Sequence, residues 1–162
     1  MRDEPLYCLV EIPKGSRNKY QWDEELGAIK LARFLFSSVV YPTDYGFVPG
    51  TLSPKGEALD ACILVSEPTF PGCWIPVRAV GILRTQDERG QDDKLLCVPF
   101  HDPNWSDIHA LGDVPDGLRN EIEHFFAIYK EPEGRKVTIH GWEDVDVAEQ
   151  VLDEARRRYA DQ

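Results

Sequence analysis

Short apolar runs, separated by Pro, Gly and charged residues, occupy most of the chain. Runs of this length, bounded by turn residues, are typical of buried strands. The acidic stretch 87–92 lies between two of them and predicts a hairpin connection. The runs predict strands over residues 7–12, 28–31, 34–41, 61–65, 75–83, 94–100 and 136–142.

Two later segments repeat apolar residues with the period of a helix. The first starts near Leu118, and the second covers about residues 147–159. Asp146 followed by Glu149 resembles a capping box at the start of the second helix. Many strands followed by two helices predict a single α+β domain over residues 1–162, with a closed or strongly curled β-barrel flanked by helices.

The charge of the chain limits its partners. Its 18 Lys and Arg residues against 29 Asp and Glu residues give a net charge of -11. A nucleic acid or an anionic membrane surface requires a positive face, so neither partner is expected. An acidic protein can still bind a phosphate compound if divalent cations lie between the two.

The location expected for the chain is the cytoplasm. No apolar run approaches the roughly 20 residues that span a bilayer, and no stretch typical of a signal peptide follows Met1. The four cysteines at positions 8, 62, 73 and 97 form no C-x-x-C pair. We expect reduced, mostly buried thiols rather than a zinc site.

Two tyrosines, Tyr41 and Tyr45, lie in the segment Tyr41-Pro42-Thr43-Asp44-Tyr45-Gly46. Its Pro and Gly residues predict a rigid turn that presents the two phenols. A phenol can donate a hydrogen bond to a phosphate oxygen or hold a water molecule in place. The alternative is that both rings belong to the hydrophobic core.

Five acids, Glu57, Asp60, Asp87, Glu88 and Asp92, lie next to a predicted strand or within the predicted hairpin. Carboxylates at neighbouring strand ends can converge on Mg²⁺, and two such ions can activate water and neutralise a leaving phosphate. The alternative is a set of solvated turn residues. Five cations, Lys19, Arg33, Lys94, Lys130 and Lys136, are candidates for a phosphate site or, alternatively, for ordinary surface charges.

These candidates fall into short motifs that follow one another along the chain. In order they are Glu11-Ile12-Pro13, Lys19-Tyr20, Tyr41-Pro42 with Tyr45-Gly46-Phe47-Val48-Pro49, Asp87-Glu88 with Gly90, Asp92 and Lys94, and Tyr129-Lys130. This ordered set resembles the soluble family I inorganic pyrophosphatases over roughly residues 5–160. Several ordered motifs in one chain are far more specific than any single one.

The resemblance implies a small closed five-stranded, OB-like β-barrel with two main α-helices in the C-terminal half. It implies Mg²⁺-dependent hydrolysis of pyrophosphate to two phosphates, and a homohexamer as the assembly. It implies these phosphate-binding residues: Lys19, Arg33, Tyr45, Tyr129, Lys130 and, as a further candidate, Lys136. It implies metal ligands at Asp60, Asp87 and Asp92, support from Glu88 and Lys94, an outer metal at Glu11, and a role for Tyr41 in positioning the nucleophile.

One segment departs from the family pattern Asp-Gly-Asp-Pro-x-Asp. Here it reads Lys55-Gly56-Glu57-Ala58-Leu59-Asp60. A charged ammonium cannot ligate Mg²⁺, so Lys55 replaces a ligand with a cation. Glu57 replaces the aspartate that receives the proton from the attacking water, and a misplacement of ~1 Å can cost ~10²-fold in rate. Gln21 likewise stands where the family has a Glu.

These changes predict fewer Mg²⁺ ions than the family norm and leave three interpretations of Lys55. Its ammonium takes the place of a metal ion, or it marks a site that no longer hydrolyses pyrophosphate, or it points into solvent. For function, the alternative to a pyrophosphatase is a relative that binds or hydrolyses another small phosphate compound. A non-catalytic phosphate-binding or assembly protein is the third hypothesis.

Overall fold

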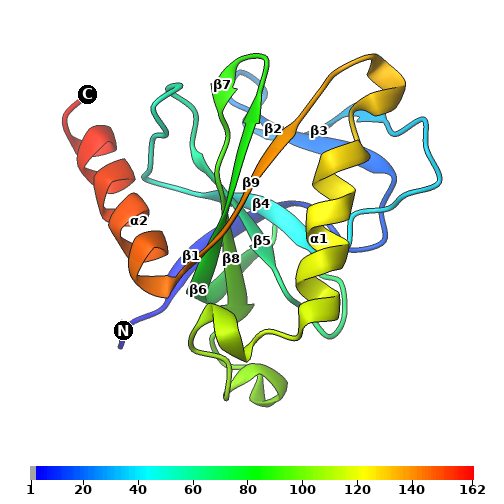
Figure 1. Ribbon diagram of the computed structural model, residues 1–162. Coiled ribbons are helices and arrows are strands. Elements are labelled where there is room, and N and C mark those ends of the chain that lie inside the picture. Colours follow the sequence, from blue (N-terminus) through cyan, green and yellow to red (C-terminus); the bar gives the residue numbers. More distant parts are fainter. Residues whose placement is uncertain (1–2) are drawn as a thin grey trace.

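The computed structural model describes residues 3–162, arranged as shown in Figure 1. The strands are β1 (Leu6–Ile12), β2 (Asn18–Asp23), β3 (Ala28–Phe34), β4 (Asp44–Val48), β5 (Leu59–Ile63), β6 (Trp74–Asp87), β7 (Gly90–Gln91), β8 (Lys94–Pro99) and β9 (Thr138–Asp144). The α-helices are α1 (Asp116–Ile128) and α2 (Val145–Ala160), and short 3₁₀ helices are η1 (Pro103–Trp105), η2 (Leu111–Asp113) and η3 (Glu131–Glu133).

Five strands form a ring in the order β1, β4, β5, β8 and β6, which closes because β6 also pairs with β1. Neighbours in the ring are antiparallel, except that β5 and β8 are parallel. The 14-residue strand β6 also pairs with β7 and β9, while β2 and β3 form a separate two-stranded sheet. A mixed sheet with this ring and two main helices confirms the predicted fold class.

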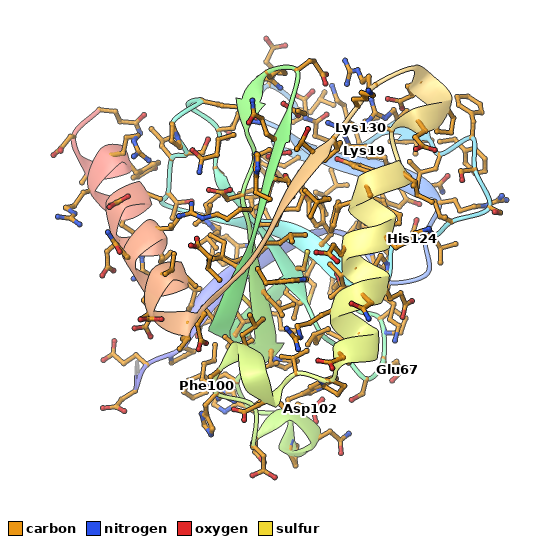
Figure 2. All side chains as sticks on the ribbon, viewed as in Figure 1. Lys19, Glu67, Phe100, Asp102, His124 and Lys130 are labelled. Carbon is orange, nitrogen blue, oxygen red and sulfur yellow. The ribbon has the colours of Figure 1, made fainter. Side chains whose placement is uncertain are left out.

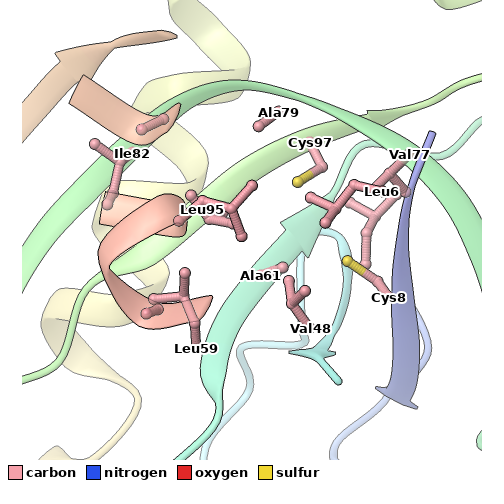
Figure 3. Packing of buried hydrophobic residues seen from close by; sticks show 14 of the residues in the cluster. Leu6, Cys8, Val48, Leu59, Ala61, Val77, Ala79, Ile82, Leu95 and Cys97 are labelled. Carbon is pink, nitrogen blue, oxygen red and sulfur yellow. The ribbon is translucent and has the colours of Figure 1, made fainter. Parts of the chain in front are cut away.

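Two hydrophobic clusters lie beneath the two helices. In the first, Ala148, Leu152 and Ala155 of α2 pack against aliphatic side chains and two cysteines of the strands (Figure 3). In the second, Phe125 and Phe126 of α1 pack against tyrosines and aliphatic side chains. Each fully buried large apolar side chain stabilises the fold by about 1.5–3 kcal/mol relative to exposure. The aromatic cluster is the one that adjoins the candidate site.

The start of α2 differs from the prediction. The helix begins at Val145, whose backbone N–H donates to the Asp144 side chain at 2.7 Å. The predicted capping box of Asp146 and Glu149 is therefore wrong, because the N-cap lies two residues earlier. The same Asp144 carboxylate accepts a hydrogen bond from the Leu111 backbone, which joins the helix start to η2.

Three strand assignments also differ. The predicted strand over residues 34–41 is wrong, because β3 ends at Phe34 and the side chains of Phe36 and Val40 are 75% and 42% exposed. Part of the predicted rigid turn after Tyr41 is in fact strand β4. Strand β2 carries mostly polar residues, so no apolar run signals it. The four cysteines are free, and three of them are buried, as predicted.

Candidate functional site

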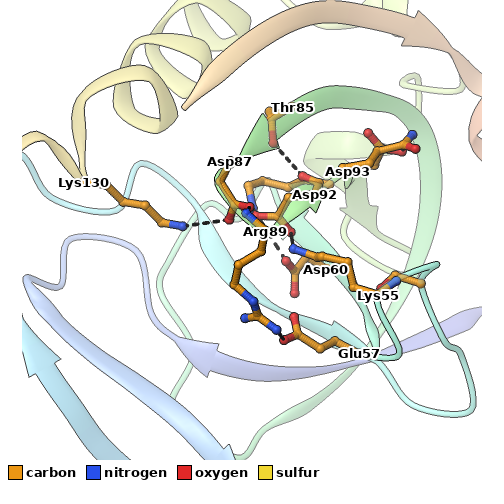
Figure 4. A network of polar contacts seen from close by, with 12 residues as sticks. Lys55, Glu57, Asp60, Thr85, Asp87, Arg89, Asp92, Asp93 and Lys130 are labelled. Carbon is orange, nitrogen blue, oxygen red and sulfur yellow. Dashed lines mark hydrogen bonds and ion pairs between the residues drawn. The ribbon is translucent and has the colours of Figure 1, made fainter. Parts of the chain in front are cut away.

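Strand ends bring three of the predicted acids together. Asp60 lies in β5, Asp87 ends β6, and Asp92 follows β7. The parallel pairing of β5 with β8 sets Asp60 directly beside Lys94. The Thr85 hydroxyl donates to the Asp92 backbone carbonyl at 2.6 Å, which fixes the hairpin against β6. Figure 4 shows these three acids close together, with Lys55 and Lys130 beside them.

Lys94 lies at the centre of this group. Its side chain is 1% exposed, and its ammonium lies 3.2 Å from Asp92 Oδ2 and 3.6 Å from Asp60 Oδ2. It also donates a hydrogen bond to the Tyr45 hydroxyl at 2.8 Å. A buried ammonium is stable only when it is paired and hydrogen-bonded, and here both conditions are met. Lys94 therefore joins the carboxylates to the tyrosine cluster.

The two carboxylates that Lys94 joins have opposite pKa shifts. Burial raises the pKa of Asp60 to about 6 against the effect of Lys94, and the neighbouring Asp92 carboxylate adds to the rise. Burial also acts to raise the pKa of Asp92, but Lys94 and Lys55 outweigh it and hold that pKa well below its ordinary value. Two adjacent carboxylates in a buried site favour a cation between them.

Lys55 points into the site. Its ammonium lies 3.4 Å from Asp92 Oδ1, and its side chain is only 12% exposed. The interpretation in which Lys55 points into solvent is therefore wrong. The loop is held by hydrogen bonds from the backbone N–H groups of Lys55 and Gly56 to Ser53. Gly56 has a φ of +84°, a conformation that L side chains rarely adopt.

Glu57 projects from the same loop onto the hairpin tip. Its carboxylate forms an ion pair with the Arg89 guanidinium, and both side chains are about half exposed. Sequence reasoning did not identify Arg89 as a partner, because an arginine at a hairpin tip has the pattern of an ordinary surface residue. The loop and the hairpin are thus joined twice, by Lys55 with Asp92 and by Glu57 with Arg89 (Figure 4).

Three further cations, Lys19, Arg33 and Lys130, lie beside this group. The Lys130 ammonium donates to Asp87 Oδ2 at 3.1 Å, and Arg33 Nε lies 2.8 Å from Glu133 Oε1. Burial, together with Arg33, Lys130 and Lys94, lowers the pKa of Lys19 to about 8. Figure 2 shows Lys19 and Lys130 near the C-terminal end of α1. Cations that lower the pKa of a neighbouring ammonium, as they do for Lys19, favour an anion beside it.

Buried donors of Tyr41 and Arg33 lack a hydrogen-bond partner within residues 3–162. They are the Tyr41 hydroxyl, on a side chain 1% exposed, and Arg33 Nε and Nη2, of which Nε lies close to Glu133 as an ion pair. The rings of Tyr41, Tyr45 and Tyr129 contact one another and α1, so the tyrosines are also core residues. Burial raises the pKa of each of these phenols, so all three remain protonated donors. Unpaired buried donors are costly, and oxygens of a ligand would satisfy them.

Gly46 is required for this arrangement. A Cβ atom at this position would lie 2.0 Å from the backbone oxygen of Leu9, so β4 can approach β1 only with glycine there. The preceding residue is Tyr45, whose hydroxyl binds Lys94. The motif Tyr45-Gly46 thus combines a functional side chain with the close approach that places it.

The remaining predicted residues lie at the edge of the group. The Glu11 carboxylate accepts a hydrogen bond from the Trp22 backbone, and burial raises its pKa to about 7, with Asp60 adding to the rise. Glu88 forms an exposed ion pair with Arg135 at 3.3 Å. Lys136 and Gln21 are exposed. The structure thus brings Asp60, Asp92, Lys55 and Lys94 into contact and pairs Asp87 with Lys130, but leaves Glu88 and Lys136 at the edge.

The carboxylates are the side chains that could hold a divalent cation. Within residues 3–162, no group of three or more His, Cys, Asp or Glu side chains is arranged to hold a metal ion, because lysines lie between the acids. Carboxylate oxygens are nevertheless the ligands that Mg²⁺ prefers. Asp60 and Asp92 share one ammonium within 3.6 Å, so a cation can contact both. These two residues fit such an ion.

Comparison with known proteins agrees with this geometry. Residues 8–160 match the family model described as inorganic pyrophosphatase. Two relatives named inorganic pyrophosphatase come from Methanosarcina mazei, 49% identical over 100% of this chain and 96% of the relative, and Methanosarcina acetivorans, 54% identical over 93% and 90%. The crystal structure of inorganic pyrophosphatase from Thermus thermophilus superposes with a TM-score of 0.94 at 41% identity, covering 98% of this chain and 92% of that one.

In the part of the chain that the structure describes, no helix has the length and apolar character needed to cross a membrane. The family match spans nearly all of the chain, and the motifs that suggested it lie on the elements described above. On this evidence, the chain belongs to the inorganic pyrophosphatase family.

Proposed function

We propose that this protein hydrolyses inorganic pyrophosphate to two phosphates and requires Mg²⁺ for the reaction. The observation that carries the proposal is the group of cations around Lys19, which lies beside unpaired donors of Tyr41 and Arg33 and opposite paired carboxylates. A pyrophosphate anion would satisfy those donors and relieve the repulsion among the cations. Relatives of similar length named inorganic pyrophosphatase support the same reaction.

In this proposal the chain's own residues hold and orient the substrate. Lys19, Arg33 and Lys130 bind phosphate oxygens, and the Tyr41 hydroxyl donates to an oxygen near the reacting phosphorus. The Tyr45 hydroxyl accepts from Lys94 and keeps its own proton to donate. Tyr129 is a further phosphate-binding residue in this proposal, and Lys136, which is exposed at the edge of the group, is an additional candidate.

The carboxylate side serves the metal and the proton. Asp60, Asp87 and Asp92 would hold Mg²⁺, with support from Glu88 on the same hairpin and with Glu11 at an outer position. Mg²⁺, when bound, supplies a more acidic water and neutralises charge on the leaving phosphate. Glu57 accepts the proton from the attacking water, which requires its carboxylate to leave Arg89 and turn toward the cluster. Attack of water on one phosphorus breaks the bridging P–O bond and releases two phosphates.

The proposal is tested by phosphate release from pyrophosphate as Mg²⁺ is varied, with the unaltered chain. We expect release with Mg²⁺ and none in excess chelator. Arg33→Met and Tyr41→Phe should each lower the rate, since both remove a donor that the substrate uses. Lys30→Met is the matched control, because Lys30 pairs with Asp23 at 2.8 Å in the separate β2–β3 sheet. Absence of release at every Mg²⁺ concentration contradicts the proposal.

The proposal also covers the assembly of the chain and its location in the cell. We propose one domain over the whole chain that associates into a homo-oligomer, a hexamer by family resemblance, in the cytoplasm. Large apolar side chains at the surface support association, among them Phe36, Phe70 and Trp74, which are 75%, 63% and 57% exposed. Four free cysteines fit a reducing compartment. Light scattering of the purified chain measures the mass; the mass of a monomer rejects the assembly.

A further inference from the structure

Lys55 is placed to neutralise the carboxylate cluster from within the chain. The two oxygens of Asp92 are divided between two ammonium groups: Oδ1 lies 3.4 Å from Lys55, and Oδ2 lies 3.2 Å from Lys94. The Lys55 side chain is 12% exposed, so little of its charge is screened by water. Lys55 thus contacts Oδ1, the oxygen of Asp92 that Lys94 does not pair with.

The charges of the cluster balance without any bound ion. The three carboxylates of Asp60, Asp87 and Asp92 face three ammonium groups, of which Lys94 contacts two of the acids, Lys130 contacts Asp87, and Lys55 contacts Asp92. An aspartate at position 55 would replace one positive charge with a negative one. The balance would then change by two negative charges, which is the charge of one divalent cation.

The backbone of the loop favours this inward position. Hydrogen bonds to Ser53 from the backbone N–H groups of Lys55 and Gly56 close a tight turn, and the Ser53 N–H donates to the Glu57 carbonyl at 2.6 Å. The ion pair of Glu57 with Arg89 holds the other side of the loop against the same hairpin. The position of the ammonium is therefore set by several contacts rather than by Lys55 alone.

We propose that Lys55 takes the place of one divalent cation in this site, so that the chain binds one ion fewer than it would with an aspartate at position 55. The ammonium acts as a tethered cation beside Asp92. It stabilises the metal-free fold, and it excludes an ion from the space next to Asp92 Oδ1. The inference rests on the proposed function only in taking Asp92 as a metal-site residue.

The test uses Mn²⁺ as the probe and needs no turnover. Equilibrium dialysis of the unaltered chain and of Lys55→Asp gives the number of ions bound per chain at saturation. We expect one additional ion per chain for Lys55→Asp. Lys30→Met, which removes a lysine that pairs with Asp23 in the separate β2–β3 sheet, should keep the unaltered number. Equal numbers for the unaltered chain and Lys55→Asp overturn the inference.

Thermal unfolding gives a second readout that remains informative if Lys55→Asp folds only with metal. Lys55→Met keeps most of the apolar stem and loses the charge. In excess chelator its melting temperature should fall by several degrees relative to the unaltered chain, and Mn²⁺ should raise it more than it raises that of the unaltered chain. No fall in chelator overturns the inference. Failure of pyrophosphate hydrolysis with the expected ion counts would reject the proposed function alone.

Discussion

The two sides of the site differ in how their charges are satisfied. On the carboxylate side, Asp60, Asp87 and Asp92 each contact an ammonium of the chain itself. On the cation side, burial and the neighbouring cations lower the pKa of Lys19. The Tyr41 hydroxyl has no hydrogen-bond partner in the described chain. The first side is therefore complete without a bound ion, whereas the second requires an anion to satisfy its donors.

The difference separates stability from binding. Substitutions on the carboxylate side should cost folding free energy, because they leave buried charges unpaired. Substitutions on the cation side should cost little stability and mainly weaken the binding of anions. Substitutions on each side test this separation, and the largest effect is expected at Lys94.

Lys94→Met should have the largest effect. It leaves Asp60 and Asp92 without their shared ammonium in a position where Lys94 is 1% exposed. Removing one partner of a buried ion pair typically costs about 3–5 kcal/mol. Urea unfolding in chelator measures this cost, with Lys30→Met as the control at an exposed pair. A loss below about 1 kcal/mol contradicts the view that Lys94 completes the carboxylate side.

The position of Lys94 also shows where sequence reasoning ends. The apolar run of β8 is visible in the sequence, but its parallel pairing with β5, which sets Lys94 beside Asp60, joins segments more than thirty residues apart. No local pattern encodes that contact. Only the resemblance to a family identified Lys94 and Asp60 as members of one site, because the order of motifs is shared by proteins in which such segments pair.

Elsewhere the local sequence pattern predicted most of the strands and helices, and the places where it failed have identifiable physical reasons. The helical period of apolar residues in α1 and the apolar runs of β1, β5, β6 and β8 predicted these elements because their apolar side chains are buried. The apolar run after Phe34 does not form a strand, and Phe36 stays exposed, because no neighbouring strand pairs with it there. The inward direction of Lys55 depends on the loop hydrogen bonds to Ser53, which the sequence does not reveal.

Arg33→Met should weaken anion binding by about ten- to a hundredfold, since a hydrogen bond to a charged group contributes about 1.5–3 kcal/mol. Isothermal titration with pyrophosphate in the absence of metal measures the change. Unfolding midpoints should fall only slightly, because the substitution breaks the partly exposed ion pair of Arg33 Nε with Glu133, whereas Nη2 has no partner in the described chain. An unchanged affinity would place the anion away from Arg33.

The titration of Lys19 should make anion binding on the cation side depend on pH. Its pKa is lowered from 10.5 to about 8, chiefly by burial and by neighbouring cations. Above pH 8 the ammonium of the free protein loses its proton, so the affinity for sulfate, whose charge is constant, should fall by up to about tenfold per pH unit. Titration at pH 7, 8 and 9 measures this fall, and Lys19→Met should flatten it. A flat profile for the unaltered chain contradicts the assignment.

Lys19 should change the stability of the fold in the opposite direction: stability rises with pH, whereas the affinity for sulfate falls. The unfolded chain keeps this proton until about pH 10.5, whereas the folded chain releases it near pH 8. The unfolded state therefore binds more protons between pH 8 and 10.5, and this residue adds stability as pH rises through that window. Below pH 8 its full penalty is present. Comparing the unfolding of the unaltered chain and Lys19→Met across that window isolates the effect.

Arg89→Ala should have the smallest effect on stability. Its ion pair with Glu57 is exposed on both sides, and such pairs contribute little. We expect an unfolding midpoint unchanged within error. Because the substitution frees the Glu57 carboxylate, the rate of pyrophosphate hydrolysis should be maintained or rise. A marked fall in the rate would show that Arg89, rather than the release of Glu57, is needed for the reaction.

The most direct test of the account is the dependence of the pyrophosphate hydrolysis rate on free Mg²⁺, measured for the unaltered chain and for Lys55→Asp below saturation. If Lys55 completes the carboxylate side, both chains hydrolyse pyrophosphate. The slope of log rate against log free Mg²⁺ is then greater by one for Lys55→Asp. Equal slopes, or an unaltered chain that releases no phosphate, would contradict the account.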